Sequence, residues 1–165
     1  MFAERNMSFA KHCVMDNRTS AVHAVRRIRE ASCIFLMGGN ATLQFRFLCE
    51  TGMLDAIRRS SAVLLGVSAG AMNMGKHVVD PYESLTPYEW LGLADLTIKA
   101  HYPFEEETLL QSLKQVSMEL PVCLMEEESA IFVKKDRILQ IGRIYRMCKG
   151  EIAPLAQAQL EQMRI

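Results

Sequence analysis

The segment Gly66-Val67-Ser68-Ala69-Gly70 could present a serine nucleophile. It follows a run of apolar residues typical of a buried strand and precedes small residues that can begin a helix. In that setting a G-x-S-x-G sequence is typical of a sharp turn that exposes the serine hydroxyl, and the helix amino terminus favours developing negative charge. The alternative is an ordinary turn whose serine caps the helix.

A nucleophilic serine needs a base, and His101 is the histidine best placed for that role. It directly follows a predicted strand, Leu96 to Ala100. His12 and His23 lie in the amino-terminal segment, and His77 lies in a polar segment predicted to be a loop. We therefore favour His101 as the general base.

The acid that would orient this histidine is not fixed by the residues alone. Glu126, Glu127 and Glu128 precede an apolar strand, and Asp80 lies on the predicted loop after the serine turn. Most such carboxylates are solvated and have no chemical role. Both positions stay open at this point.

A pair of glycines could supply the donors that stabilise an oxyanion. Gly38, Gly39 and Asn40 end the strand that neighbours the serine strand, so they are expected at the same sheet edge. Backbone N–H groups of Gly38 or Gly39, with that of Ala69, would form the donor pair. A plainer interpretation is that the glycines end the strand and Asn40 caps the next helix, and both can hold together.

These residues must be positioned by an α/β fold, because short apolar runs alternate with longer amphipathic segments. This pattern predicts a three-layer sandwich around a mostly parallel sheet. The predicted strands are 33–37, 62–66, 96–100, 122–125, 130–133 and 138–144, and the predicted helices are 20–32, 42–59 with a break near Gly52, 68–74 and 105–119. Residues 78–90 contain two prolines and are predicted to be a surface loop.

The bulk composition predicts one domain spanning residues 1–165. The 19 basic and 19 acidic residues cancel and are scattered, which argues against nucleic acid or a membrane surface as a partner. The five cysteines are spread out and are expected to be free, buried thiols in the cytoplasm. No apolar stretch reaches the roughly 20 residues that span a bilayer, and no metal-ligand spacing or nucleotide loop is present, so no metal and no cofactor are expected.

Taken together, these motifs resemble the serine peptidases that include dipeptidase E and cyanophycinase, which share a class I glutamine amidotransferase-like fold. The resemblance runs from about Ser20 to Gly150. Its motifs, in chain order, are Gly38-Gly39-Asn40 with Leu43, Gly52 and Ile57, then Gly66 to Ala71, Gly92-Leu93 leading to His101-Tyr102, and Glu127-Glu128-Ser129-Ala130.

The resemblance implies a flavodoxin-like sheet, attack by Ser68, proton transfer by His101, and an oxyanion hole near Gly39 and Ala69. Its third catalytic residue is a glutamate before the closing strand in cyanophycinase-like members, here Glu127, which we prefer. In dipeptidase E it is an aspartate on the loop after the turn that carries the serine, for which Asp80 is the nearest counterpart. The implied substrate is a small peptide, with Asp-Xaa dipeptides as one class, and such folds are compatible with a homodimer.

The chain departs from the resemblance at its start, because members open with a buried strand that has no counterpart before Met1 to Asp16. That strand is central in a flavodoxin-like order, so its absence is expected to leave an unpaired gap in the sheet. Residues near Phe9 to Met15, or a second subunit, could fill this gap.

Two other functions compete with a serine peptidase. The first is a noncatalytic amidotransferase-like module for binding or assembly, in which the missing strand has loosened the site. The second is an α/β-hydrolase esterase, which also uses G-x-S-x-G but places its histidine after the acid, near the end of the chain. No histidine follows His101 here, which argues against an esterase.

Overall fold

The computed structural model describes residues 2–80, 84–134 and 137–161, with the backbone alone at 80 and 84–89. The short 3-10 helix η1 (Ala3–Arg5) precedes α1 (Ala21–Glu30), which begins where the Ser20 hydroxyl accepts a hydrogen bond from the His23 N–H. The strand β1 (Cys33–Leu36) follows. These bounds agree with the predicted helix and strand to within a few residues, which is the usual precision of helix ends.

The predicted long helix after β1 is divided as expected at Gly52. Asn40 caps α2 (Ala41–Glu50) by accepting a hydrogen bond from the Leu43 N–H at 2.8 Å. Gly52 then takes a φ of 69°, in the left-handed region that glycine tolerates best, and α3 (Met53–Arg58) begins there. The strand β2 (Val63–Gly66) and the helix α4 (Ala69–Met74) complete this half of the chain.

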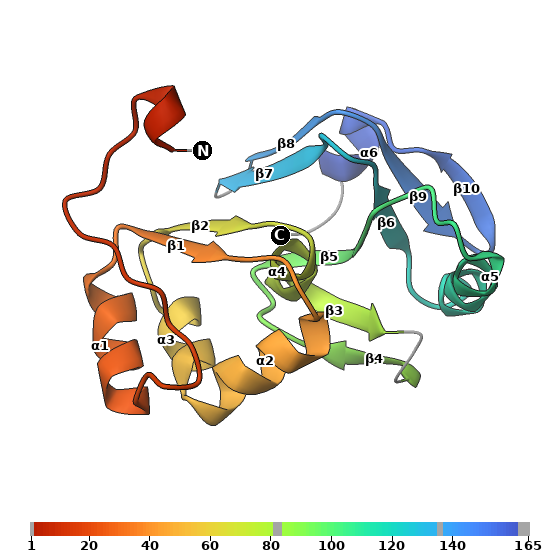
Figure 1. Ribbon diagram of the computed structural model, residues 1–165. Helices are drawn as coiled ribbons and strands as arrows, with labels where there is room; N and C mark the ends of the chain where they lie inside the picture. Colours follow the sequence, from red (N-terminus) through yellow and green to blue (C-terminus); the bar gives the residue numbers. More distant parts are fainter. Residues whose placement is uncertain (1, 81–83, 135–136, 162–165) are drawn as a thin grey trace.

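Two sheets lie at the centre of the molecule (Figure 1). The strands β1 and β2 pair in parallel, with Cys33 opposite Val63 and Leu36 opposite Gly66. A six-stranded sheet has the order β10-β9-β6-β5-β3-β4, whose strands are Glu151–Pro154, Ile144–Cys148, Val122–Met125, Ala94–Ala100, Gly75–Asp80 and Ser84–Glu89. In this sheet β5 pairs in parallel with β3 and with β6. The α/β class with parallel pairing at its centre is therefore confirmed.

The segment from Val78 to Trp90 was predicted to be a surface loop, and this prediction is wrong. The strands β3 (Gly75–Asp80) and β4 (Ser84–Glu89) pair there in an antiparallel manner and extend the six-stranded sheet. Val78, Val79 and Trp90 are all buried. Two adjacent valines have high strand propensity, and this signal outweighs the nearby prolines and polar residues.

The carboxyl-terminal part contains more strands than predicted. The helix α5 (Glu107–Val116) leads into β6, and β7 (Ala130–Lys134) forms a hairpin with β8 (Arg137–Ile141). The predicted strand 138–144 is divided, because a turn at Gly142 and Arg143 separates β8 from β9 (Ile144–Cys148). The strand β10 (Glu151–Pro154) and the helix α6 (Gln157–Glu161), neither of which was predicted, follow.

Apolar packing agrees with the prediction at most positions but not at all. Ile28, Leu48 and Ile57 are buried between α1, α2, α3 and β1, as expected, whereas Val22 and Leu43 are exposed. The prediction that the cysteines are buried holds only for Cys123. Cys13 and Cys49 are exposed, and Cys33 and Cys148 are half-buried; all five are free thiols. In the described part of the chain, no helix is long and apolar enough to cross a membrane.

The edge of β1 that faces away from β2 has no paired strand in the described part of the chain. Phe9 to Met15 do not fill this position, because they form no strand. Instead, the ring of Phe2 contacts the rings of Phe9 and Phe35 at centroid distances of 5.2 and 6.2 Å. The amino-terminal segment thus covers part of one face of β1.

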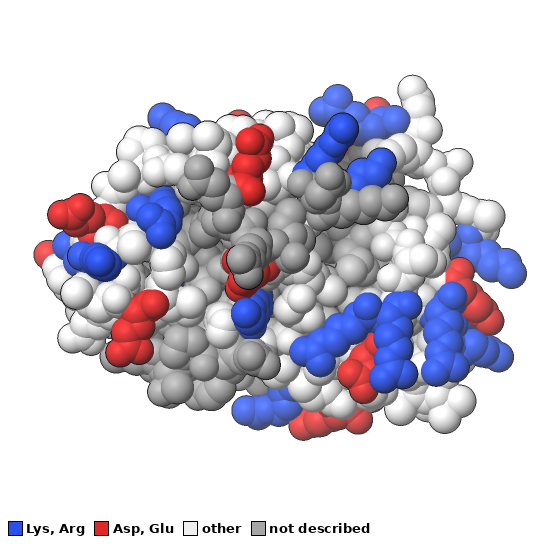
Figure 2. All heavy atoms as spheres, turned by 180° about the vertical axis from the view of Figure 1, so that it is seen from behind, with Lys and Arg blue, Asp and Glu red and all other residues white. Residues whose placement is uncertain are grey.

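Charged side chains are unevenly distributed although the net charge is zero. Figure 2 shows Lys and Arg side chains gathered over the end of the molecule that carries α1 and α3. Exposed arginines at this end are Arg26, Arg29, Arg58 and Arg59. The carboxyl ends of β5 and β6, described next, carry mainly carboxylates.

Candidate active site

Ser68 lies on a strained turn between β2 and α4. Its backbone has φ 53° and ψ −116°, a conformation that side-chain-bearing residues seldom adopt. Its hydroxyl makes no capping hydrogen bond to the helix. The alternative of a simple helix-capping serine is therefore not what the structure shows, and the hydroxyl is directed elsewhere.

Both glycines of the motif are required by close backbone packing. A Cβ on Gly66 would lie 2.7 Å from the carbonyl of Gly70, and a Cβ on Gly70 would lie 2.0 Å from the carbonyl oxygen of Leu36 in β1. The amide of buried Asn73, on α4, adds a link by donating to the Ala41 carbonyl at 3.2 Å and to Gln44 at 2.7 Å. The turn that carries Ser68 is thus packed between β1 and α2, and this packing fixes the position of the serine.

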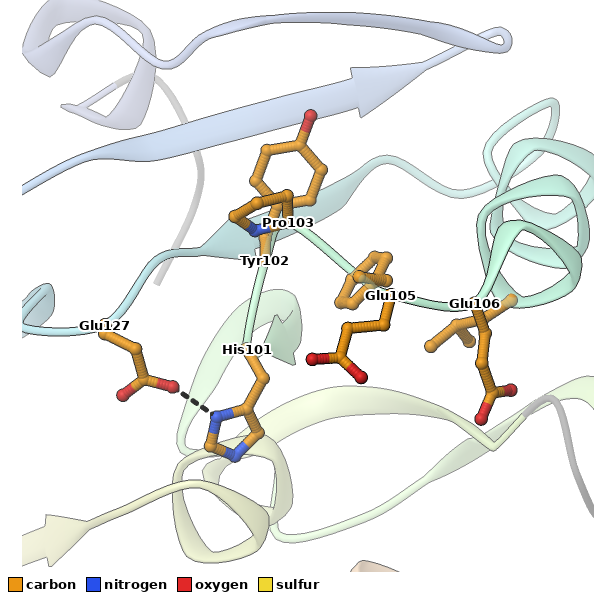
Figure 3. Close-up of a pocket in the computed structure, with 8 residues that line it drawn as sticks. His101, Tyr102, Pro103, Glu105, Glu106 and Glu127 are labelled. Atoms are coloured by element: carbon orange, nitrogen blue, oxygen red, sulfur yellow. Dashed lines mark hydrogen bonds and ion pairs between the residues drawn. The ribbon is translucent and has the colours of Figure 1, made fainter.

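The structure brings Ser68, His101 and Glu127 together in one chain of hydrogen bonds. The Ser68 hydroxyl lies 2.7 Å from Nε2 of His101, and Nδ1 of the same ring lies 2.6 Å from Oε1 of Glu127. Figure 3 shows the Glu127 carboxylate directed at the imidazole, which comes from the end of β5. The His101 and Glu127 side chains are 60% and 77% exposed, so this arrangement is open to solvent.

The carboxylate adjacent to Glu127 has different partners. Glu126 is 15% exposed and accepts hydrogen bonds from Nε of Arg143 at 2.6 Å and from the Tyr145 hydroxyl at 3.0 Å. The hydrogen bond to this carboxylate raises the pKa of Tyr145 above its ordinary value. The three consecutive glutamates predicted as one group therefore divide, since Glu126 faces β9 and Glu127 faces His101.

The glycines predicted to form an oxyanion hole lie beside the serine. A Cβ on Gly38 would be 3.4 Å from the Ser68 Cβ and 3.9 Å from its hydroxyl oxygen, so the two residues are in near contact. Gly39 has φ 139°. Within the described part of the chain, the N–H groups of Gly38 and Gly39 donate to no other residue. Asn40 caps α2, and Ala69 is the first residue of α4.

The remaining sequence candidates lie elsewhere. Asp80 ends β3, and its side chain lies outside the described residues, so its place relative to His101 stays open. His12 is exposed in the amino-terminal segment, and His23 is exposed on α1, where its ring accepts a hydrogen bond from Arg27. His77 lies within β3.

An open cavity of about 430 Å³ adjoins the imidazole. It is lined by His101, Tyr102, Pro103, Phe104, Glu105, Glu106, Leu109 and Glu127. Figure 3 shows the labelled residues of this lining on the segment between β5 and α5 and on the turn after β6, and Leu109 lies in the first turn of α5. The cavity is large enough for one or two amino-acid side chains, and a group bound in it would lie beside the imidazole of His101 and the carboxylate of Glu127.

Sequence reasoning missed Arg143, Tyr145 and Asn73. Each acts through a partner far away in the chain, which no local motif reveals. The one available signal was Gly142, where φ is 76° and an added Cβ would lie 2.8 Å from the Glu128 carbonyl oxygen. A glycine before an arginine in a strand-rich region indicates a tight turn, but not what the turn touches.

The comparisons with known proteins identify a family and a fold. A sequence model described as peptidase family S51 matches residues 2–141. Among solved structures, a peptidase from an acI-B1 Actinobacterium superposes with a TM-score of 0.61 at 19% identity, covering 82% of this chain and 61% of that one. A Listeria monocytogenes protein described as a candidate peptidase E has a TM-score of 0.61 at 22% identity, covering 74% and 65%.

Two curated relatives carry a different name. They are pyridoxal 5'-phosphate synthase subunits PdxT from Pyrobaculum aerophilum, 28% identical over 130 residues, and from Deinococcus radiodurans, 26% identical over 115 residues. The matches cover 72% and 67% of this chain, and 64% and 56% of the relatives. The chain therefore spans less than two thirds of the length of these relatives.

Proposed function

Because the chain belongs to peptidase family S51, we propose that it is a serine peptidase in which Ser68 is the nucleophile, His101 the base and Glu127 the orienting acid. The observation that carries this proposal is the continuous hydrogen-bond chain from the Ser68 hydroxyl through both imidazole nitrogens to Glu127. A capping serine and an unrelated histidine would not align in this way. The same geometry supports Glu127 as the acid.

The proposed reaction begins when Oγ of Ser68 attacks the carbonyl carbon of a peptide bond while Nε2 of His101 takes the hydroxyl proton. The carbonyl oxygen becomes an oxyanion, which N–H groups of Gly38 or Gly39 and of Ala69 would stabilise. Glu127, bonded to Nδ1, stabilises the imidazolium that forms. The N–H groups of Gly38 and Gly39 have no other acceptor in the described chain, which supports this assignment.

The intermediate collapses when the carbon–nitrogen bond breaks and His101 returns its proton to the leaving amine. An ester on Ser68 remains. His101 then removes a proton from water, the resulting hydroxide attacks the ester carbon, and the proton passes to Ser68 as the acid product leaves. The protein ends the cycle unchanged, and no cofactor enters any step.

We propose small peptides as the substrate class, because the cavity beside His101 is open and has room for only a few residues of a bound peptide. The preference for Asp-Xaa dipeptides remains a prediction from the family resemblance. An aspartyl side chain would be expected to bind a cation, and none of the described residues that line the cavity is Lys or Arg. A panel of peptides must therefore decide this preference.

The experiment measures amino-acid release from dipeptides with aspartyl, alanyl and lysyl amino termini, together with labelling by a fluorophosphonate that reacts with activated serines. We expect Ser68→Ala to abolish both signals and the exposed Ser61→Ala to leave both unchanged. If the wild type is labelled but releases no amino acid, Ser68 is still an activated nucleophile and the tested dipeptides are not its substrates. If the folded wild type gives neither signal, the noncatalytic module becomes the better interpretation.

A further inference from the structure

The position of Glu127 depends on contacts that it does not itself make. Its carboxylate is 77% exposed, and within the described part of the chain its only hydrogen-bond partner is His101. An exposed glutamate has several freely rotating bonds, and holding it in one place costs conformational entropy. The backbone turn that carries Glu127 must therefore be held by its neighbours.

That turn is held through Glu126. The Glu126 N–H donates to the Arg143 carbonyl at 3.2 Å, and the Ser129 hydroxyl donates to the Glu126 carbonyl at 2.6 Å. The Glu126 side chain accepts from Arg143 and Tyr145, one on each carboxylate oxygen. The residue before Glu127 is thus fixed by backbone and side chain to the start of β9.

The same strand also reaches the histidine side of the site. The Tyr145 ring lies 5.1 Å from the ring of Tyr102, which directly follows His101. The Tyr102 N–H donates to the Met125 carbonyl at 2.9 Å, at the end of β6. Tyr145 therefore contacts both the residue after the base and the residue before the acid.

Charge adds a second reason for the arrangement. Two neighbouring carboxylates repel each other, and either could compete for the imidazole. Arg143 pairs with Glu126 and leaves Glu127 as the acceptor that faces His101. Arg143 is itself 79% exposed, so its guanidinium is not required to fill the core.

We propose that Arg143 and Tyr145 are positioning residues that hold Glu127 against His101 through Glu126. This inference rests on the proposed peptidase function, in which Glu127 is the acid. It assigns a function to Arg143, in the turn before β9, and to Tyr145, on β9, neither of which contacts the nucleophile. A purely structural role would instead affect folding and leave the alignment of Glu127 unchanged.

The kinetic test is a double-mutant cycle on the peptide that the wild type cleaves best. We expect Arg143→Ala to lower kcat about tenfold with KM within about twofold, since small misalignments of a catalytic group reduce turnover strongly. Arg143→Lys should recover part of the loss, and Tyr145→Phe should reproduce part of it. In a Glu127→Gln background, Arg143→Ala should cost less than about twofold, because the group that it positions is already lost. If the reductions in kcat caused by Arg143→Ala and Glu127→Gln multiply fully in the double variant, the inference is overturned.

The control and a second measurement separate this inference from the proposed function. Arg137→Ala, at the exposed start of β8, removes the same side chain without touching Glu126 and should leave kcat unchanged. The Nδ1 proton of His101, followed by NMR, should lose its downfield signal in Glu127→Gln and show a weakened one in Arg143→Ala. If that signal responds but no peptide is cleaved, the positioning holds and the peptidase proposal fails. If Arg143→Ala leaves the signal unchanged, the positioning itself is wrong.

Discussion

At the scale of single residues, the side chains of Ser68 and His101 meet, and the backbones of both residues are strained. Both residues have positive φ values, 53° and 68°, which most side-chain-bearing residues avoid. Such conformations cost on the order of 1–3 kcal/mol each and persist only where surrounding structure enforces them. In this protein the enforcing contacts are those of Gly66, Gly70 and the turn after β5.

The identity of the acid can be decided by a matched pair of amide variants. Glu127→Gln should lower kcat by about 10²- to 10⁴-fold, since the amide cannot hold the imidazole in the same tautomer and charge state. Asp80→Asn removes the same charge from the other candidate and should leave kcat within about twofold. The measurement is steady-state peptide hydrolysis at one pH. The reverse ranking would assign the acid to Asp80, as in dipeptidase E.

Cys123 makes stability depend on alkaline pH. Burial raises the pKa of its thiol from 9.0 to about 11, because the thiolate is poorly solvated there. The native state then keeps a proton that the unfolded chain loses, so the unfolding free energy should fall as pH rises from about 9 to about 11. The difference corresponds to about 2–3 kcal/mol. Urea unfolding of Cys123→Ala should show a flatter pH dependence in this range; an unchanged slope would contradict the assignment.

Residue types predicted which candidate residues lie together where a local motif fixes the backbone. Ser68, His101 and the glycines at 38 and 39 were selected from turns that follow strands, and the structure places them together. Burial of single side chains was less predictable. Cys49 and Val22 are apolar in type but face solvent, because helix orientation is set by packing with other elements.

At the scale of elements, the helix α4 depends on its close approach to β1. A Cβ on Gly70 would lie only 2.0 Å from a backbone oxygen, which cannot move away easily. We therefore expect Gly70→Ala to reduce the free energy of unfolding by about 3 kcal/mol or more. Gly150→Ala is the comparison, because φ is 79° there but the nearest atom is 4.0 Å away, and about 1 kcal/mol is expected. Equal losses in urea unfolding would contradict this account.

Elements with one clear period were predicted, whereas β3, β4 and β10, which form by pairing with a neighbouring strand, were not. The strand β6 and the break at Gly52 followed from apolar runs and a glycine. The strands β3 and β4 stabilise each other across a short connection, and β9 and β10 do the same. Such pairing depends on cross-strand contacts that a single segment does not record.

At the scale of the whole molecule, the sheet is divided where α4 lies. In the described residues β2 pairs only with β1, and α4 contacts β1, β2, β3 and β5. We expect hydrogen exchange to separate the two parts, with amides of β1 and β2 exchanging faster than those of β6, all four of whose residues are buried. Measurement by mass spectrometry at residue resolution would show this, and a single common rate would contradict it.

The family resemblance predicted an unpaired edge in the sheet, and residues near Phe9 to Met15 or a second subunit were the candidates to fill it. Which segment pairs with the edge of a sheet depends on the whole fold. The amino-terminal segment has no periodic apolar pattern that would predict a strand beside β1. The structure shows aromatic contacts from Phe2 to Phe9 and Phe35 rather than a strand. The family resemblance therefore predicted the gap without indicating what lies over it.

The openness of the imidazole and its carboxylate bears on the fate of an ester formed at Ser68. The side chains of His101 and Glu127 are 60% and 77% exposed, so an ester formed beside them would meet bulk water directly. An amine present at low concentration would then be outcompeted as the second nucleophile. Enzymes that join peptides must exclude water at this stage, since hydrolysis of the intermediate is the side reaction that a closed site prevents. The proposed ester is therefore expected to be hydrolysed rather than to pass its acyl group to another amine.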